Sequence, residues 1–249
     1  SLCFKVSVES EAGILSSYFD SDYKNSGAEV VKSEKTLLSD ADLIFAIVRP
    51  DIKLLKLFKK GSILICQMET YINSSELKDI AKLGITCFAL EQVPRISRAQ
   101  SMDVLSSQSN LAGYRAVIEA SQIYRKAFPM MMTAAGTIPP ARVLVMGAGV
   151  AGLQAIATAK RMGAIVSATD VRPAAKEQVE SLGGKFVAVE DEEFKEAESS
   201  GGYAKQMSAA YQKKQAELVS KTISDQDIVI TTALIPGKQA PTLLDDDAV

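Results

Sequence analysis

The sequence contains no histidine, no tryptophan and only three cysteines among its 249 residues. Without histidine there is no imidazole ligand for a metal, and proton transfer near neutral pH has to use lysine, tyrosine, cysteine or a perturbed carboxylate. The cysteines (Cys3, Cys66 and Cys87) are odd in number and widely spaced in apolar runs. This pattern indicates buried thiols in a reducing compartment, and we expect neither a metal centre nor a disulfide framework.

Long apolar runs and an excess of basic charge are also missing. No apolar stretch approaches the ~20 residues of a membrane-spanning helix. The longest candidate, residues 134–150, is interrupted by two prolines and three glycines. The net charge of −2 leaves no basic footprint for nucleic acid. Charged residues make up 23% and apolar residues 47%, so we expect a soluble chain of one large or two ordinary domains.

Short apolar runs alternate with amphipathic segments in both halves of the chain, which favours parallel strands joined by crossover helices. A long helical pattern covers residues 103–128, and Pro139–Pro140 marks a boundary. We predict an α/β protein with two Rossmann-like, doubly wound parallel-sheet domains, residues 1–139 and 140–249. Because the chain opens in a strand and the second half shows only four strands, we expect both ends to be truncated. The predicted strands are 4–8, 43–48, 63–66, 86–90, 142–146, 165–169, 185–189 and 228–232, and the other predicted helices are 52–60, 75–83, 150–162, 174–182 and 204–219.

A glycine motif, Gly147-Ala-Gly149-Val150-Ala-Gly152, follows the apolar run 143–146 and opens a helical pattern. In the G-x-G-x-x-G arrangement, the first glycine permits a tight turn and the second lets the backbone approach phosphates. The third glycine lets the helix pack closely on the strand. Backbone N–H groups and the positive end of the helix dipole would then hold a pyrophosphate. The alternative is that the glycines serve only a tight turn.

Asp170 ends the next predicted strand, 23 residues after Gly147, where an acidic residue accepts hydrogen bonds from the adenosine ribose. In the alternative interpretation Asp170 caps a helix. A carboxylate at this position repels a 2′-phosphate and favours NAD over NADP. Arg172 could accept that phosphate, reach the pyrophosphate or remain solvated. The strand, the spacing and the acid together predict an NAD(H) site.

A polar cluster occupies residues 93–107, after a predicted strand end, where ligands bind in α/β sheets. Arg95, Gln100, Asp103 and Ser106 lie in this segment, which has few apolar residues. On composition alone, a polar helix N-terminus with Asp103 in its first turn explains the cluster equally well.

Two further segments carry candidate ligand contacts. Gly201-Gly202-Tyr203 lies at the end of an acidic stretch, 190–202, that we expect to be a mobile loop. The two glycines before the tyrosine form either a hinge that swings the ring over a ligand or a loop tip without function. Residues 231–241 follow the last predicted strand and are expected beside the nicotinamide end of the cofactor. The residues that we assign to NAD(H) are Gly147, Gly149, Val150, Gly152, Asp170, Val171, Arg172, Gly202, Tyr203 and Leu234.

Four stretches (93–113, the glycine motif with Asp170, 201–205 and 231–241) together closely resemble the NAD(H)-binding component of proton-translocating NAD(P) transhydrogenase. The segment from Pro94 to Ser101, Pro-Arg-Ile-Ser-Arg-Ala-Gln-Ser, is specific to that family. The resemblance implies direct hydride transfer from NADH to NADP+, driven by proton translocation. It also implies a homodimer formed partly through a hairpin matching residues 130–138.

The partners implied by the resemblance are a component that holds NADP(H) and a membrane component that conducts protons. Through them the chain is expected on the cytoplasmic face of a bacterial membrane or the matrix face of the mitochondrial inner membrane. In that family, the loop matching Arg95, Gln100, Asp103 and Ser106 contacts the nicotinamide end and the partner's cofactor, so we assign these four residues as catalytic. Tyr203 matches a tyrosine in a mobile loop that closes over bound nucleotide.

The absence of histidine fits this resemblance, because hydride passing between two nicotinamides moves no substrate proton and needs no general base. The expected contribution of the chain is positioning of the nicotinamide. Two other functions are the alternatives to this one. An alanine-dehydrogenase-like oxidoreductase relies on a histidine and a lysine near its substrate, whereas an NADH-sensing protein has no need of the polar cluster 93–107.

Overall fold

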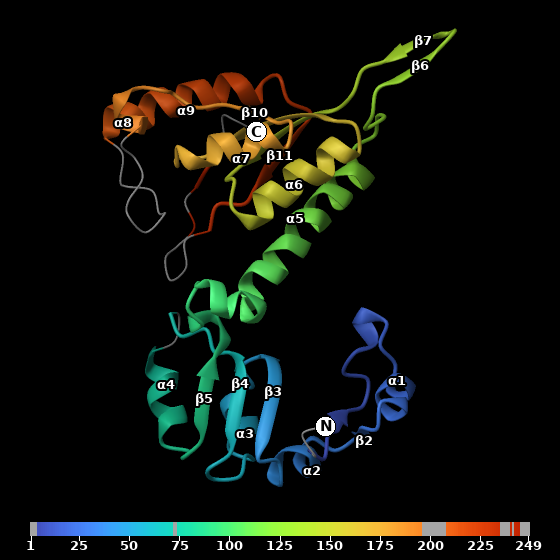
Figure 1. The fold of residues 1–249 in the computed structure, drawn as a ribbon, viewed down its shortest axis with the longest axis vertical. Helices are drawn as coiled ribbons and strands as arrows, with labels where there is room; N and C mark the ends of the chain where they lie inside the picture. The colour runs from blue at the N-terminus through green and yellow to red at the C-terminus, as the bar shows by residue number, and fades with distance from the viewer. Residues whose placement is uncertain (1–3, 72–73, 196–207, 235–239, 241, 245–249) are drawn as a thin grey trace. The chain divides into compact units, whose positions relative to one another are not determined.

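The computed structural model describes residues 4–71, 74–195, 208–234, 240 and 242–244 (Figure 1). The chain divides into two compact units, Ser1–Asp103 and Val104–Val249. The main sheet of each unit consists of parallel strands joined by helices. This arrangement confirms the predicted α/β class.

The second unit is built on a four-stranded sheet in the order β10-β9-β8-β11, in which all neighbouring strands are parallel. From β8 the chain steps outward to β9 and β10 and then returns to β11 on the other side of β8. In open α/β sheets, ligands bind at the carboxyl ends of the strands where the order reverses in this way. The elements are β8 (Arg142–Met146), α6 (Val150–Arg161), β9 (Ile165–Thr169), α7 (Ala174–Ser181), β10 (Lys185–Phe186), α8 (Glu192–Lys195), α9 (Ala209–Ile223) and β11 (Ile228–Thr231).

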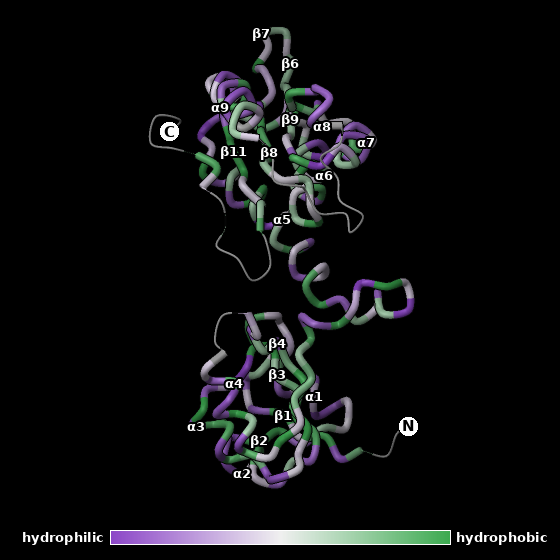
Figure 2. The backbone as a smooth tube through the Cα atoms, turned by 90° about the vertical axis from the view of Figure 1, so that its left-hand side faces the viewer, coloured by the Kyte–Doolittle hydropathy of each residue, from purple (hydrophilic) through white to green (hydrophobic). Residues whose placement is uncertain are grey.

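Both faces of this sheet are covered by helices. Alternate residues of β8 point to opposite faces of the sheet and pack against different helices. Val143 and Val145 are fully buried in a cluster with residues of α6, α7 and the long helix α5 (Val104–Ile123). Leu144 and Met146 are buried on the other side, against α9. Figure 2 shows the hydrophobic colouring of β8 and β11. Continuous apolar strands are typical of parallel sheets covered on both faces, and the observed bounds of β8 and β9 equal the predicted ones.

Helix α5 belongs to the second unit, where it lies beside α6 (Figure 1). Gly113 and Val117 are its buried residues. A Cβ at Gly113 would lie 2.0 Å from the carbonyl oxygen of Ala151 in α6. The division between units therefore falls at residues 103/104, whereas the sequence pattern places it at 139/140, because this helix buries its glycine face against α6. An antiparallel hairpin of β6 (Met131–Thr133) and β7 (Gly136–Ile138) follows in the same unit.

The first unit contains a three-stranded parallel sheet, β3-β4-β5, and a separate parallel pair, β1-β2. Leu64 and Cys66 of β4 are fully buried, in a cluster with Leu55, Phe58 and Ile80. The elements are β1 (Ser7–Glu9), η1 (Ile14–Ser16), α1 (Asp20–Asn25), β2 (Glu29–Val31), α2 (Glu34–Ser39), β3 (Leu43–Val48), α3 (Ile52–Leu55), β4 (Ile63–Gln67), α4 (Ser74–Ala81), β5 (Thr86–Ala89), η2 (Leu90–Gln92) and η3 (Ser97–Met102).

Several elements differ from their predicted bounds. Helix α3 ends at Leu55 instead of residue 60, because the following residues form turns up to Gly61, whose φ is +86°. Strand β10 has two residues instead of five, and α8 forms within the stretch 190–202, where no helix is predicted. Helix α9 is shifted to Ala209–Ile223 from the predicted 204–219. None of the described helices combines the length and the hydropathy that a membrane span requires.

Candidate functional site

The glycine turn, residues 147–152, joins the carboxyl end of β8 to the first turn of α6. Gly147 has a φ of +100°, in the left-handed region that favours glycine. Its N–H donates to the carbonyl oxygen of Thr169 at the end of β9, over 2.8 Å. A Cβ at Gly147 would lie 3.0 Å from Oγ1 of Thr232. Both the backbone conformation and the limited space therefore require glycine at this position.

The other two glycines of the motif have opposite surroundings. A Cβ at Gly152 would lie 1.8 Å from the carbonyl oxygen of Gly147, so the first turn of α6 packs directly on the backbone of the turn. A Cβ at Gly149 would meet no protein atom within 4 Å. The lack of a side chain at Gly152 thus serves packing, whereas at Gly149 it leaves the backbone open to an approaching group.

This geometry fits the pyrophosphate of a dinucleotide. Gly149 is the N-cap residue of α6, and the first turn of that helix carries no acidic side chain. The first N–H groups of a helix have no partner within the helix and lie at the positive end of its dipole. The open space at Gly149 is where a phosphate can approach these groups.

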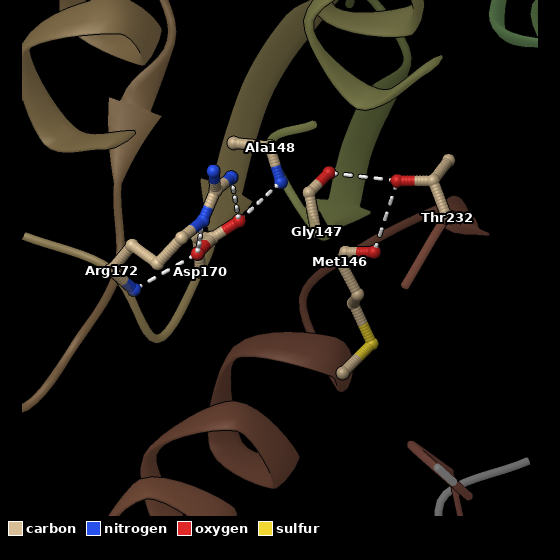
Figure 3. Close-up of polar contacts among 6 residues, drawn as sticks. All are labelled: Met146, Gly147, Ala148, Asp170, Arg172 and Thr232. Atoms are coloured by element: carbon tan, nitrogen blue, oxygen red, sulfur yellow. Dashed lines mark hydrogen bonds and ion pairs between the residues drawn. The ribbon is translucent and has the colours of Figure 1, made fainter. Parts of the chain in front are cut away.

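Thr232, directly after the neighbouring strand β11, makes hydrogen bonds to the chain at the start of the glycine turn. Its N–H donates to the carbonyl oxygen of Met146 (2.8 Å). Its hydroxyl lies 2.8 Å from the carbonyl oxygen of Gly147, to which it donates, and 3.4 Å from that of Met146 (Figure 3). The sequence pattern places residues 231–241 near the cofactor but does not reveal this contact. Thr232 connects the end of β11 to the turn that is expected to bind phosphate.

Replacing Thr232 by valine is expected to lower the free energy of unfolding by about 1 kcal/mol, because it removes one hydrogen bond while keeping the shape of the side chain. The affinity for NADH should fall about threefold, since the turn is held less firmly. Chemical denaturation and calorimetry measure the two effects. The exposed neighbour Thr231 provides the control. Equal effects of T231V and T232V would contradict a special role for the hydroxyl of Thr232.

Asp170 follows β9 and lies beside the glycine turn (Figure 3). Its Oδ2 accepts from the N–H of Ala148 (2.7 Å), and its Oδ1 accepts from the N–H of Arg172 (2.9 Å). The guanidinium of Arg172 donates to both oxygens through Nε and Nη2, each over 2.9 Å. The Asp170 side chain is only 7% exposed. The alternative in which Arg172 is merely solvated is therefore not what the structure shows.

Helix α9 makes hydrogen bonds to the end of β9 and to the segment after β10 through two side chains that no sequence motif indicates. The amide of Gln215 donates to Oγ1 of Thr169 (3.0 Å) and accepts from the N–H of Val189 (2.9 Å). The hydroxyl of Tyr211 donates to the carbonyl oxygen of Val189 (3.1 Å), and its ring stacks on Phe194. Burial, with nearby carboxylates, raises the pKa of Tyr211 to about 12. Tyr211 is therefore a structural residue and not a base near neutral pH.

In the first unit, the polar cluster follows a carboxylate that fixes the end of β5. Glu91 accepts hydrogen bonds from the N–H groups of Met68 (2.9 Å) and Thr70 (3.1 Å) and from the hydroxyl of Thr70. Burial raises the pKa of Glu91, but the hydrogen bonds to its carboxylate outweigh this effect and lower the pKa overall. Glu91 thus ties the segment after β4 to the chain that leads into Arg95.

The structure brings the glycine turn, Asp170 and Arg172 together at the carboxyl ends of β8 and β9 in the four-stranded sheet. Val171 and Leu234 are exposed, by 45% and 76%, after the ends of β9 and β11. Gly202 and Tyr203 lie outside the described residues. Arg95, Gln100 and Asp103 belong to the first unit, and Ser106 lies at the start of α5 in the second.

The chain matches two family models: alanine dehydrogenase/PNT, N-terminal domain, over residues 1–112, and alanine dehydrogenase/PNT, C-terminal domain, over residues 116–249. An NAD(P) transhydrogenase subunit alpha protein of Rhodospirillum rubrum is 54% identical over 253 residues, which cover 100% of this chain and 66% of that protein. The corresponding protein of Rickettsia prowazekii is 50% identical, over 99% of this chain and 65% of its own length. The chain therefore spans just under two thirds of the length of these relatives.

Solved structures agree with the sequence comparison. Transhydrogenase from Sinorhizobium meliloti superposes with a TM-score of 0.88 at 52% identity, over 99% of this chain and 66% of that one. L-alanine dehydrogenase, at 21% identity and a TM-score of 0.75, shows the same fold over 98% of this chain and 62% of that one. These findings confirm the resemblance predicted from the sequence. The chain belongs to the alanine dehydrogenase/PNT family and is similar along its whole length to alpha subunits of NAD(P) transhydrogenase.

Proposed function

We propose that this chain is the NAD(H)-binding component of a proton-translocating NAD(P) transhydrogenase. NADH bound at the glycine turn supplies a hydride that passes directly to NADP+ on a separate component. The observation that carries this proposal is the pair of glycines in the turn: Gly152 is packed against the carbonyl of Gly147, while Gly149 leaves open space at the start of α6. Asp170, beside the turn, supplies acceptor oxygens for the adenosine ribose.

The chemistry of the chain also supports transfer between two nicotinamides. The sequence contains no histidine, and the pKa of the buried Tyr211 is raised to about 12 by burial and neighbouring carboxylates. An enzyme that oxidises an amine or an alcohol has to remove a proton along with the hydride, whereas hydride exchange between nicotinamides does not. This difference weighs against an alanine-dehydrogenase-like reaction, although that name is part of the family's description.

In this proposal, Arg95, Gln100, Asp103 and Ser106 hold the nicotinamide end and face the partner's cofactor. Gly202 and Tyr203 contact the bound nucleotide. The chain pairs as a homodimer partly through residues 130–138, where Met131 and Met132 are exposed. It associates with a proton-conducting membrane component and so lies at a membrane surface, on the cytoplasmic or the matrix side.

Replacing Asp103 by asparagine is expected to lower the rate of hydride transfer about tenfold while the Kd for NADH changes less than about twofold, because Asp103 positions the nicotinamide and does not hold the phosphates. Stopped-flow absorbance measures the rate, and calorimetry measures the Kd. Asp42→Asn, at an exposed ion pair with Lys59, is the control. Parallel losses of rate and affinity in Asp103→Asn would assign this residue to binding instead.

The experiment that tests the proposal is calorimetric titration of the complete protein with NADH and with NADPH, followed by a hydride-exchange assay. In the assay, the NADP(H)-binding component carries NADPH, and an NAD+ analogue with shifted absorbance is added to this chain. A clear preference for NADH together with exchange is the expected result. NADH binding without exchange would support a sensor, and equal or tighter binding of NADPH would contradict the proposal.

A further inference from the structure

The carboxylate of Asp170 already accepts as many hydrogen bonds as it has positions for. An ionised carboxylate offers about four acceptor positions, two on each oxygen. In the structure, Oδ1 accepts from the N–H and Nε of Arg172, and Oδ2 accepts from the N–H of Ala148 and Nη2 of Arg172. Ribose hydroxyls that donate to Asp170 therefore have to replace one of these four donors.

The guanidinium bonds are the ones that can be exchanged. The N–H of Ala148 belongs to the glycine turn, and the N–H of Arg172 is fixed by the chain just two residues after Asp170. Moving either donor would require rearrangement of the backbone. The side chain of Arg172 is 30% exposed, so its fork can rotate toward solvent while the backbone stays in place.

The same ion pair changes how the site treats a 2′-phosphate. A lone carboxylate next to the ribose repels a group that carries a charge of about −1.5 to −2. Here Nη2 of Arg172 lies 2.9 Å from Oδ2 of Asp170, so the positive charge of the guanidinium offsets the negative charge of the carboxylate. An arginine fork also binds phosphate oxygens well, so a guanidinium displaced from Asp170 is suited to contact a 2′-phosphate.

We propose that Arg172 is the specificity-determining residue of the adenosine-ribose site: it competes with the ribose hydroxyls for Asp170 and masks the repulsion that would otherwise exclude NADP(H). This inference rests on the proposed function, in which the site takes NADH. The carboxylate favours NADH, and the guanidinium limits how strongly it does so. Discrimination between the two nucleotides is then set by the pair and not by Asp170 alone.

The test is calorimetric titration of the complete protein and its variants with NADH, NADPH, AMP and adenosine 2′,5′-bisphosphate; the last two probes isolate the adenosine half. For Arg172→Gln, the Kd for NADH and AMP should fall or stay within about threefold, while the Kd for NADPH and the bisphosphate should rise at least about tenfold. Arg172→Lys keeps the positive charge but loses the fork, so it should weaken binding of the 2′-phosphate by about threefold, less than Arg172→Gln does.

Lys176→Gln is the matched control, because this nearby cation pairs with Glu190 instead of Asp170 and should leave the preference unchanged. Thermal melting of each variant identifies loss of folding. If Arg172→Gln does not fold, weaker binding of the bisphosphate but not of AMP by Arg172→Lys supports the inference, and equal changes in Kd for the two probes overturn it. Equal weakening of all four probes by Arg172→Gln would assign Arg172 to the pyrophosphate and overturn the inference, and so would an unchanged preference. Failure of the unmodified protein to bind NADH would instead overturn the proposed function.

Discussion

Replacing Gly152 by alanine is expected to lower the free energy of unfolding by about 3 kcal/mol, although alanine normally stabilises a helix relative to glycine by about 1 kcal/mol. The added Cβ would lie 1.8 Å from the carbonyl oxygen of Gly147 and 2.9 Å from Oγ1 of Thr232. The first of these neighbours is backbone, so it cannot rotate away. Relief requires α6 to move outward from β8, which also pulls its first N–H groups away from a bound phosphate. We therefore expect loss of both stability and NADH binding.

Gly149→Ala is the matched variant for this prediction. Its backbone is extended, with a φ of −76°, and a Cβ there meets no protein atom within 4 Å. Its stability should stay within about 0.5 kcal/mol of the unmodified protein, because the position is unstrained and open. NADH should nevertheless bind at least about tenfold more weakly, since the methyl group occupies the approach of the phosphates. Urea denaturation and calorimetry separate the two effects. A stable Gly152→Ala, or a Gly149→Ala with normal NADH affinity, would contradict the assigned roles.

Replacing Gly113 by alanine is expected to cost about 2 kcal/mol of stability, because α5 would be forced away from α6. The added Cβ would lie 2.0 Å from the carbonyl oxygen of Ala151, which sits in the first turn of α6. Ser106 is seven residues earlier in α5, on the same helix face and about 10.5 Å away along the axis. Displacement of α5 therefore moves Ser106 relative to the glycine turn. Hydride transfer should slow more than NADH binding weakens.

The measurements for Gly113→Ala are chemical denaturation, the Kd for NADH and the rate of hydride transfer. Ala112→Gly, at an exposed position of the same helix, provides the control and should cost about 1 kcal/mol through helix propensity alone, with no change in rate. If Gly113→Ala stabilises the protein, as the propensity scale alone predicts, then the close crossing of the two helices is contradicted.

The parts of the fold that the sequence predicts best are three short, mostly apolar strands and the helix that follows the glycine motif. Strands β3, β8 and β9 have the predicted bounds, and α6 begins at the predicted Val150. The residues of β8 and β9 after the first are buried, whereas β3 is largely exposed, and glycines mark where the turn after β8 begins. By contrast, α1, β2 and α2 have three to six residues each and contain no buried residue, so no apolar periodicity predicts them.

The candidate site likewise has features that the sequence predicts and contacts that it does not. Glycine spacing and one acidic residue are sufficient to predict that the turn and Asp170 lie side by side, since both follow neighbouring parallel strands. The contacts of Arg172, Thr232 and Gln215 depend on rotamers and on a strand that returns from far along the chain. No pattern in the sequence encodes which acceptor a long side chain selects. The contacts of these three residues became visible only with the tertiary structure.

The return of β11 to the side of β8 also has a kinetic consequence. Strands β8, β9 and β10 and their helices follow one another along the chain, whereas the Thr232–Gly147 hydrogen bond joins residues 85 positions apart. Contacts across such long stretches of chain form slowly during folding, because the ends of a long loop have to meet first. The glycine turn is thus completed after its own helix has formed. In refolding experiments, NADH-binding competence should appear later than the helical circular-dichroism signal.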